Sequence, residues 1–405
     1  MEMKKNRVFS IIIVIFILFL IINGIKIREK SDYYYFQWGL NNDTQFYIPK
    51  NILENNNNVY KFDLPIENEL KDFFFNSANI NNIKNVDYDN LNVYSNRGID
   101  ISYKKAQNVY SKIKNKKSVI VAIIDTGIYY MHDDLKHSFW KNEDEIYNNG
   151  IDDDNNGYID DYYGYDFYND DSSIYDKEDE DIHATHAAGT IVANNDKKGI
   201  SGIADNDYVK IMVLKILGER QRGSTASLIK AIQYAEKMGA DICNVSLGTA
   251  NYNDELKNIM KNSNMLFVAA SGNGRKTMGY NIDINKIYPA AFDFDNIITV
   301  SNICFDGNRY ISANYGNSVD IYAPGTFILS TLPENKYGFL TGTSVAAPFV
   351  CGVAAMLKSS YNLDSKEIKN IIINSAKNIT DSDEENIKVL DAYNAIKLAG
   401  KEFND

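Results

Sequence analysis

Three short stretches of this sequence each carry a side chain that could take part in nucleophilic catalysis. The first, residues 341–348, reads TGTSVAAP and places Ser344 directly ahead of an apolar run at 345–357. That run predicts a buried helix with Ser344 at its N-terminus. Unpaired N–H groups and the positive end of the helix dipole favour an oxyanion there, and Pro348 is expected in or near the first turn. Taken alone, the stretch fits a serine that caps a core helix equally well.

Two further stretches supply an acid and a base. Residues 121–127 read VAIIDTG and predict a buried parallel strand that ends at Asp125. Ligands of open α/β sheets bind at that end of the strands. Residues 183–190 read HATHAAGT and predict a tightly packed helix of small residues with His183 at its start. The chain therefore offers a carboxylate, an imidazole and a hydroxyl, in that order.

These motifs and their order resemble the subtilisin family of serine proteases, also called subtilases or peptidase family S8, from about residue 118 to 398. Asp, His, Ser is the triad order known from subtilisin. Two more motifs follow in the family's order: NVSLG at 244–248 looks like the substrate-binding strand, and AASGN at 269–273 looks like the oxyanion turn. Ala184 stands where the family usually has glycine, and Phe349 where histidine is common. Neither departure removes a group of the triad.

The resemblance implies a serine endopeptidase that hydrolyses peptide bonds of a polypeptide substrate. Ser344 would attack the carbonyl, His183 would take its proton, and Asp125 would hold the imidazole in the right tautomer. Asn273 and the backbone N–H of Ser344 would bind the oxyanion. His186, one turn further along its helix, is expected to be a packed core residue. The pocket for the residue before the cut should be lined by Ser246, Leu247, Gly248, Ala270 and Gly272.

Strands and helices alternate after residue 118, which predicts the α/β class. The expected fold has three layers, a mainly parallel sheet with helices on both faces, as in subtilisin-like proteins. The predicted strands are 209–217, 240–247, 265–270, 297–303 and 319–323. The predicted helices are 225–238, 255–261, 366–375 and 390–398.

An export signal is expected within residues 1–30. Lys4, Lys5 and Arg7 precede an apolar run at 8–22, which reaches the usual spanning length of about 17–25 residues only if 23–27 are included. No alanine pair marks a cleavage site. The favoured interpretation is an uncleaved signal anchor that holds an external catalytic domain at the cell membrane. A cleaved, secreted form and a buried core helix are the alternatives.

The rest of the chain divides into an N-terminal segment, 31–110, and a catalytic domain, 111–400. Residues 33–40 resemble the start of many mature subtilisin-like domains, and 98–113 look like its continuation into the first helix. Residues 41–97 then form an insertion. The competing interpretation makes about 31–97 a short propeptide.

Residues 152–160, DDDNNGYID, predict a calcium site. Oxygen-bearing side chains at alternate positions, followed by Gly157, match the opening of an EF-hand-like loop. Tyr163 replaces the glutamate at the twelfth position, so Asp161 or Glu145 would have to complete the site. The resemblance adds that subtilases often use calcium to hold surface loops, while a solvated acidic turn is the simpler alternative. The expected ligands are the side chains of Asp152, Asp154, Asn156 and Asp160, and the carbonyl of Tyr158.

The acidity of the chain is local. Residues 133–181 hold 18 Asp and Glu against three Lys, whereas the whole chain has a net charge of −12. No basic stripe points to nucleic acid as a partner. Three cysteines in apolar segments predict buried thiols and no disulfide framework.

Three other classes of function are alternatives to the protease. A catalytically silent subtilisin-like module, with a binding or regulatory role, has Ala184 as its only hint. An α/β-hydrolase esterase would need a Gly-x-Ser-x-Gly elbow and the order Ser, Asp, His, neither of which is present. An external adhesion or calcium-binding domain would leave Asp125, His183 and Ser344 unexplained.

Overall fold

The computed structural model describes residues 37–40, 98–275, 278–381, 383 and 385–403. It also gives the backbone of three short strands, β1 (Gln45–Tyr47), β2 (Val59–Tyr60) and β3 (Asn92–Tyr94). The expected export signal at 1–30 lies outside the described residues, as does most of 31–97. The boundaries predicted there, and the choice between an insertion and a propeptide, stay predictions.

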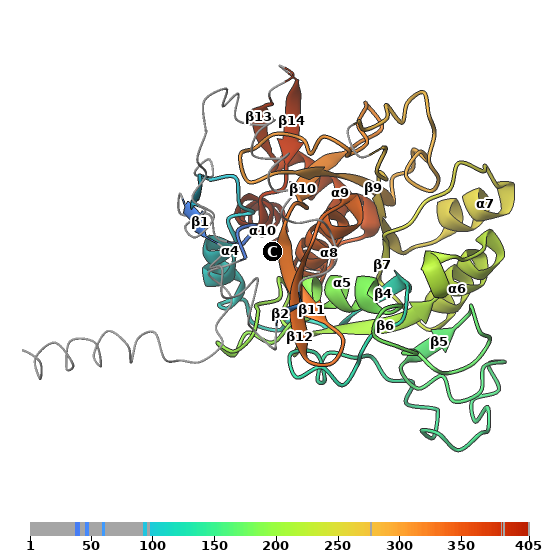
Figure 1. Ribbon diagram of the computed structural model, residues 1–405. Coiled ribbons are helices and arrows are strands. Elements are labelled where there is room, and N and C mark those ends of the chain that lie inside the picture. Colours follow the sequence, from blue (N-terminus) through green and yellow to red (C-terminus); the bar gives the residue numbers. More distant parts are fainter. Residues whose placement is uncertain are drawn as a thin grey trace, which may run out of the picture.

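A nine-stranded sheet forms the middle of the molecule (Figure 1). Its spatial order is β13-β14-β10-β9-β8-β7-β4-β6-β5, and all neighbouring pairs except β13 with β14 are parallel. β4 lies between β7 and β6, which both come later in the chain, so it stands at a switch point of the strand order, where ligands of such sheets bind. The strands are β4 (Val119–Asp125), β5 (Gly164–Asp166), β6 (Val209–Lys215), β7 (Ile242–Val245), β8 (Leu266–Ala270), β9 (Ile297–Ile303), β10 (Ile321–Pro324), β13 (Lys377–Thr380) and β14 (Asn386–Val389).

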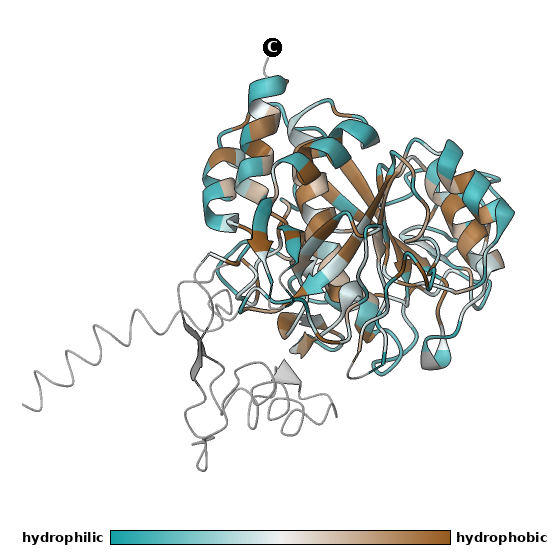
Figure 2. Ribbon diagram, turned by 90° about the horizontal axis from the view of Figure 1, so that it is seen from above, coloured by the Kyte–Doolittle hydropathy of each residue, from teal (hydrophilic) through white to brown (hydrophobic). Residues whose placement is uncertain are grey.

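Helices cover both faces of this sheet. Along β4, Val121 and Ile123 belong to one core, and Ala122 and Ile124 to the other. Figure 2 shows the apolar strands between helices whose outer surfaces are hydrophilic. The predicted three-layer α/β fold is therefore observed. One layer holds α4 (Tyr103–Tyr110), α5 (Ile182–Val192), α8 (Thr343–Ser360), α9 (Ser365–Asn374) and α10 (Ala392–Glu402), and the other holds α6 (Thr225–Lys237) and α7 (Asp254–Asn262).

Local sequence signals explain where several helices begin and end. Ser224 caps α6 by accepting the N–H of Ser227, and Gly239, with φ of +79°, follows its last turn. Asp364 and Glu367 form a reciprocal capping box at the start of α9. These ends lie within a residue or two of the predicted ones, because the signals are short-range.

A hairpin that the sequence analysis did not predict packs beside the site helices. It consists of β11 (Ile328–Leu332) and β12 (Lys336–Leu340), which pair in antiparallel register. Ser330 Oγ donates to the carbonyl of His186 at 2.7 Å, which joins the hairpin to α5. The turn places Glu334 and Asn335 at positive φ, as a tight hairpin requires.

Among the described helices, α8 has the length and apolar composition that a membrane span would need. However, 83% of its apolar window is buried inside the protein. It is the central helix of the core, and the apolar run expected to meet a membrane, 8–22, lies outside the described residues.

Candidate active site

Three elements bring the predicted acid, base and nucleophile to one place. Asp125 is the last residue of β4, His183 is the second residue of α5, and Ser344 is the second residue of α8. Each therefore stands at an element end, where the backbone leaves the core and a side chain can reach the groove. The helix expected from residue 345 begins two residues earlier, at Thr343.

A continuous chain of hydrogen bonds links these side chains. His183 Nδ1 lies 2.8 Å from Asp125 Oδ1 and 2.9 Å from Oδ2, and His183 Nε2 lies 2.9 Å from Ser344 Oγ. Asp125 is fully buried, whereas the His183 side chain is 18% exposed. The chain thus runs from a buried carboxylate, through the imidazole, to a hydroxyl at the groove.

The charge of Asp125 makes the imidazole of His183 a stronger base. Burial acts to lower the pKa of His183, but the charge of Asp125 and its hydrogen bond outweigh burial, so the pKa is raised above its usual value of 6.5. With Nδ1–H donating to the carboxylate, Nε2 is the free acceptor for the serine hydroxyl. The arrangement can move a proton from Ser344 to His183.

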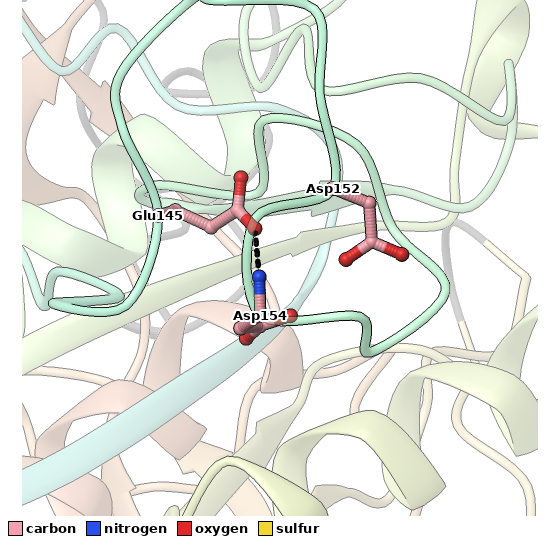
Figure 3. Close-up of side chains that lie close together, drawn as sticks. All are labelled: Glu145, Asp152 and Asp154. Carbon is pink, nitrogen blue, oxygen red and sulfur yellow. Dashed lines mark hydrogen bonds between the residues drawn. The ribbon is translucent and has the colours of Figure 1, made fainter.

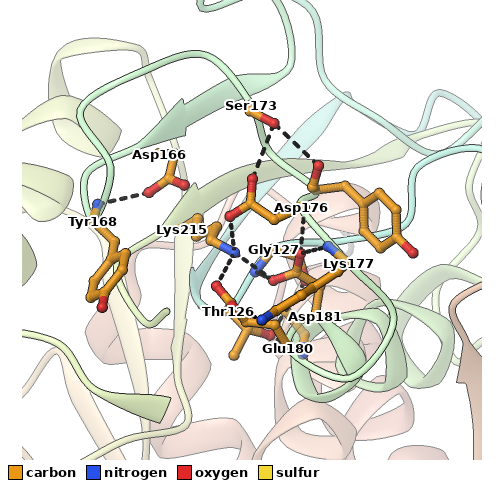
Figure 4. A network of polar contacts seen from close by, with 12 residues as sticks. Thr126, Gly127, Asp166, Tyr168, Ser173, Asp176, Lys177, Glu180, Asp181 and Lys215 are labelled. Atoms are coloured by element: carbon orange, nitrogen blue, oxygen red, sulfur yellow. Dashed lines mark hydrogen bonds and ion pairs between the residues drawn. The ribbon is translucent and has the colours of Figure 1, made fainter. Parts of the chain in front are cut away.

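A buried lysine fixes the start of α5 (Figure 4). Lys215, at the end of β6, is fully buried, and its Nζ lies 2.9 Å from Asp176, 2.9 Å from Glu180 and 2.7 Å from Asp181. We call these four residues the Lys215 cluster. Asp181 directly precedes α5, and its Oδ1 also accepts the N–H of Gly127 at 2.8 Å. The cluster therefore ties the helix of His183 to the segment that follows Asp125.

The Asp-Thr-Gly motif contributes to this junction through its two small residues. Thr126 Oγ1 accepts the N–H of Ala184 at 3.0 Å, so it caps the first turn of α5. A Cβ at position 127 would lie 2.7 Å from Oδ1 of Asp181, which only glycine avoids. Lys215 was not predicted from the sequence, although a lysine at the end of an apolar strand is the signal that would have found it.

Asn273 is held in place by the start of α8. Its Oδ1 accepts the N–H of Thr343 at 3.2 Å, so Nδ2 is directed elsewhere. A Cβ built on Gly342 would lie 3.4 Å from Asn273 Nδ2 and 3.2 Å from Ser344 Oγ. Glycine at 342 therefore keeps free the small space that the amide and the hydroxyl share.

Pro348 lies in the second turn of α8, so the expectation that it sits in or near the first turn was wrong. Because the helix begins at Thr343, the missing N–H of Pro348 leaves the carbonyl of Ser344 without its helical partner. Ser246 Oγ donates to that carbonyl at 3.0 Å, and Asn244 Nδ2 donates to Ser246 Oγ at 2.9 Å. The end of β7 is thus bonded to the backbone of Ser344.

A groove of about 640 Å³ opens in front of these residues. His183 and Ser344 line it, together with Asn273 and the residues predicted to form the pocket for the residue before the cut. Those residues are Ser246, Leu247, Gly248, Ala270 and Gly272. The structure therefore brings the predicted substrate-binding residues to one cavity with His183, Asn273 and Ser344, while Asp125 lies buried behind His183.

His186 faces the core. It is 1% exposed, and its Nε2 lies 2.8 Å from the carbonyl oxygen of Ile328 in β11. Burial lowers the pKa of His186 to about 3. The second histidine of the motif is a neutral packing residue, as the sequence indicated.

A second acidic cluster lies in the loop between β4 and β5 (Figure 3). One carboxylate oxygen from each of Glu145, Asp152 and Asp154 lies within 4.8 Å of the others, and we call these residues the Glu145 cluster. Glu145 Oε1 accepts the N–H groups of Asp153 and Asp154, but its buried Oε2 has no hydrogen-bond partner among the described residues. Burial raises the pKa of Glu145.

The other predicted calcium ligands are used differently in this loop. Asn156 Oδ1 accepts the N–H of Tyr158, and Asn156 Nδ2 donates to Asp154. Asp160 accepts the N–H groups of Asn149 and Gly150 at 2.7 and 2.9 Å, so it caps the preceding turn. The structure gathers Asp152 and Asp154 around Glu145, and the ligand set stays a prediction.

Known proteins resemble this chain over most of the described region. The family model described as Subtilase family matches residues 116–392. The major intracellular serine protease of Bacillus subtilis (strain 168) is 35% identical over 262 residues, which cover 63% of this chain and 73% of that protein. Subtilisin DY of Bacillus licheniformis is 32% identical over 287 residues, covering 69% and 90%.

A solved structure of a protease from Pseudoalteromonas arctica PAMC 21717 aligns with a TM-score of 0.58 and 25% identity, covering 74% of this chain and 94% of that one. The family match spans most of the catalytic domain and includes Asp125, His183 and Ser344. The chain therefore belongs to the subtilase family and is a subtilisin-like serine protease.

Proposed function

We propose that this protein is an endopeptidase in which Ser344 is the nucleophile, His183 the general base and acid, and Asp125 the residue that orients the imidazole. The observation that carries the proposal is the unbroken chain of hydrogen bonds from Asp125 through His183 to Ser344, which ends at the groove. A polypeptide lying in that groove would present a carbonyl to Ser344 Oγ.

The reaction follows from the positions of these atoms. Ser344 Oγ forms a bond to the carbonyl carbon while its proton passes to His183 Nε2, and Asn273 Nδ2 and the Ser344 N–H bind the oxyanion. As the C–N bond breaks, His183 gives the proton to the leaving amine. Water then attacks the acyl-enzyme, with its proton taken up by the same nitrogen, and Ser344 is regenerated.

Substitution of the nucleophile or the base tests the triad. We expect Ser344→Ala or His183→Ala to lower kcat by about 10⁶, the loss known from subtilisin. Ser360→Ala at the far end of α8 is the matched control and should keep normal activity. The measurement is peptide hydrolysis, with circular dichroism to verify folding. Near-normal rates in either triad variant would defeat the assignment.

The same assay at different pH values tests the role of His183. A base must be neutral to act, and Asp125 raises the pKa of His183, so kcat/KM should rise with pH through a midpoint above 6.5. A rate that stays flat across this interval, with the chemical step limiting, would count against His183 as the base.

We also propose that the Glu145 cluster holds a structural Ca²⁺ ion. Three carboxylates converge there, one buried oxygen has no partner, and Ca²⁺ takes carboxylate oxygens as ligands. Glu145, Asp152 and Asp154 would hold the ion, which would pin the loop ahead of α5. No step of peptide hydrolysis involves it.

The proposed location is the outer face of the cell membrane, with residues 8–27 as the anchor. The warrant is the apolar run behind a basic N-terminus and the absence of a small-residue cleavage site. The protein should stay with salt-washed membranes and be digested by protease added to intact cells. A soluble product that begins near Ile25 would refute the anchor.

A further inference from the structure

The pocket beside Asn273 is where the residue before the scissile bond must lie. A carbonyl oxygen bound by Asn273 Nδ2 places the rest of its residue next to Gly272, the preceding position in the chain. The groove there is bounded by the segments 246–248 and 270–272. The size of the space between these two walls therefore sets which side chains the proposed protease accepts.

One methyl group, Cγ2 of Ile287, lies between the walls. A Cβ built on Gly248 would be 2.5 Å from it, and a Cβ built on Gly272 would be 3.7 Å from it. The Cβ position of Gly272 is also only 3.0 Å from Asn314 Nδ2. A single side chain thus reaches both walls of the slot.

The backbone of Ile287 is held in place by its neighbour. Tyr288 forms an antiparallel bridge with Thr249, with N–H to carbonyl distances of 2.7 and 2.8 Å. The opposite wall is braced by Asn314, whose Nδ2 donates to the carbonyl of Ser271 at 2.9 Å. Isoleucine is β-branched and has few χ1 rotamers. Neither wall nor methyl group can move aside without breaking these bonds or leaving a preferred rotamer.

Among the described residues, those that line the groove include no aspartate, glutamate, lysine or arginine. A charged side chain in the slot would lose its hydration without gaining an ion pair, which disfavours it strongly. The slot is therefore selective for size and for the absence of charge.

We infer that Ile287 is a specificity-determining residue that restricts the position before the cut to short, uncharged side chains such as alanine and serine. The inference rests on the proposed function and adds the substrate class to it. Removing the methyl groups of Ile287 opens the slot to larger apolar side chains, while short ones lose little.

The test uses the full chain purified in detergent and three peptides that differ only in the residue before the cut, which is alanine, leucine or phenylalanine. We expect the unmodified protein to cleave the alanine peptide with a kcat/KM at least about tenfold above that for phenylalanine. Ile287→Ala should raise the phenylalanine-to-alanine ratio by about tenfold or more. Ile284→Ala, 79% exposed on the same segment and not lining the groove, is the matched control and should leave the ratio unchanged.

The possible outcomes separate the inference from the proposed function. A preference of the unmodified protein for phenylalanine, or an unchanged ratio in Ile287→Ala, overturns the inference and leaves the protease in place. Failure of the unmodified protein to cut any of a wide set of peptides overturns both. If Ile287→Ala does not fold, the fallback is Ile287→Val, which removes one methylene and keeps Cγ2. This variant should still favour the alanine peptide, which would support the inference. If it cleaves all three peptides equally, that result opposes the inference.

Discussion

The Lys215 cluster and the Glu145 cluster belong to the same acidic stretch of the chain but obtain their positive charge in different ways. In the first, a fully buried ammonium from β6 meets three carboxylates. In the second, three carboxylates converge, and the described residues provide no cation among them. One cluster is completed by folding alone, and the other is left with a buried oxygen that has no partner.

The difference shows that acidic composition alone does not identify a metal site. Burying an ammonium is costly unless its protons are paired, and burying carboxylates is costly unless they meet a cation. In the Lys215 cluster, the buried ammonium pairs with the three carboxylates, so both costs are removed and the cluster needs no ion from solution. The Glu145 cluster has acceptors in excess, which is the condition under which an external ion is favoured.

The largest effect should come from removing the internal cation. Lys215→Met leaves three carboxylates without their partner at the start of α5, so we expect a loss of about 3–5 kcal/mol in the free energy of unfolding. The measurement is urea unfolding of the Ser344→Ala background, which avoids self-digestion. If Lys215→Met does not fold, Glu180→Gln, which keeps the cation, should give a smaller loss in the same direction.

Lys177→Met is the control for that prediction. Lys177 also contacts Glu180, at 3.4 Å, but its side chain is 50% exposed. Exposed ion pairs contribute little, so this substitution should leave the unfolding midpoint almost unchanged. Equal effects of the two lysine substitutions would show that burial of Lys215 has no special role.

A smaller effect is expected from removing the external cation. Calcium at a hundred times its Kd would add about 2.7 kcal/mol to the free energy of unfolding, so a chelator should lower the melting temperature. Asp154→Ala should make melting insensitive to calcium. Asp153→Ala, a neighbour outside the Glu145 cluster, should retain the response. Identical melting curves with calcium and with chelator would rule out the ion.

Low pH should reduce this calcium effect. Because the pKa of Glu145 is raised in the ion-free protein, the stability that its protonation contributes is lost as pH rises through that pKa. Calcium needs the ionised form, so its stabilisation should shrink as pH falls and protons compete for the same oxygens. The difference between the two melting temperatures, followed with pH, measures this competition.

The parts of the site that the sequence predicted depend on local pattern. Asp125, His183 and Ser344 each stand in a short motif whose strand end or helix start can be read from adjacent residues. Lys215 and Ile287 were missed because their roles depend on contacts with distant segments. Lys215 meets Asp181, 34 residues earlier in the chain, and Ile287 meets Gly248 across a bridge between two loops.

Pro348 and Asp160 show that local pattern can also give a wrong position or role for a residue. A shift of two residues in the start of α8 moved Pro348 into the second turn, and its effect became visible only through the Ser246 bond. Asp160 has the spacing of a ligand, but it caps a turn formed by residues before the loop. Residue spacing limits which side chains can lie close together, and the hydrogen bonds of the surrounding backbone determine which of them do.

The position of α8 late in the chain has a consequence for synthesis. Asp125 and His183 leave the ribosome long before Ser344, and α8 lies against β7, β8, β9 and β10 and against α10, near the C-terminus. The N–H of Ala392, where α10 begins, donates to the carbonyl of Ile101, shortly before α4. If Ser344 is the nucleophile, as proposed, a chain that has not yet reached α8 lacks the group that would attack a peptide bond.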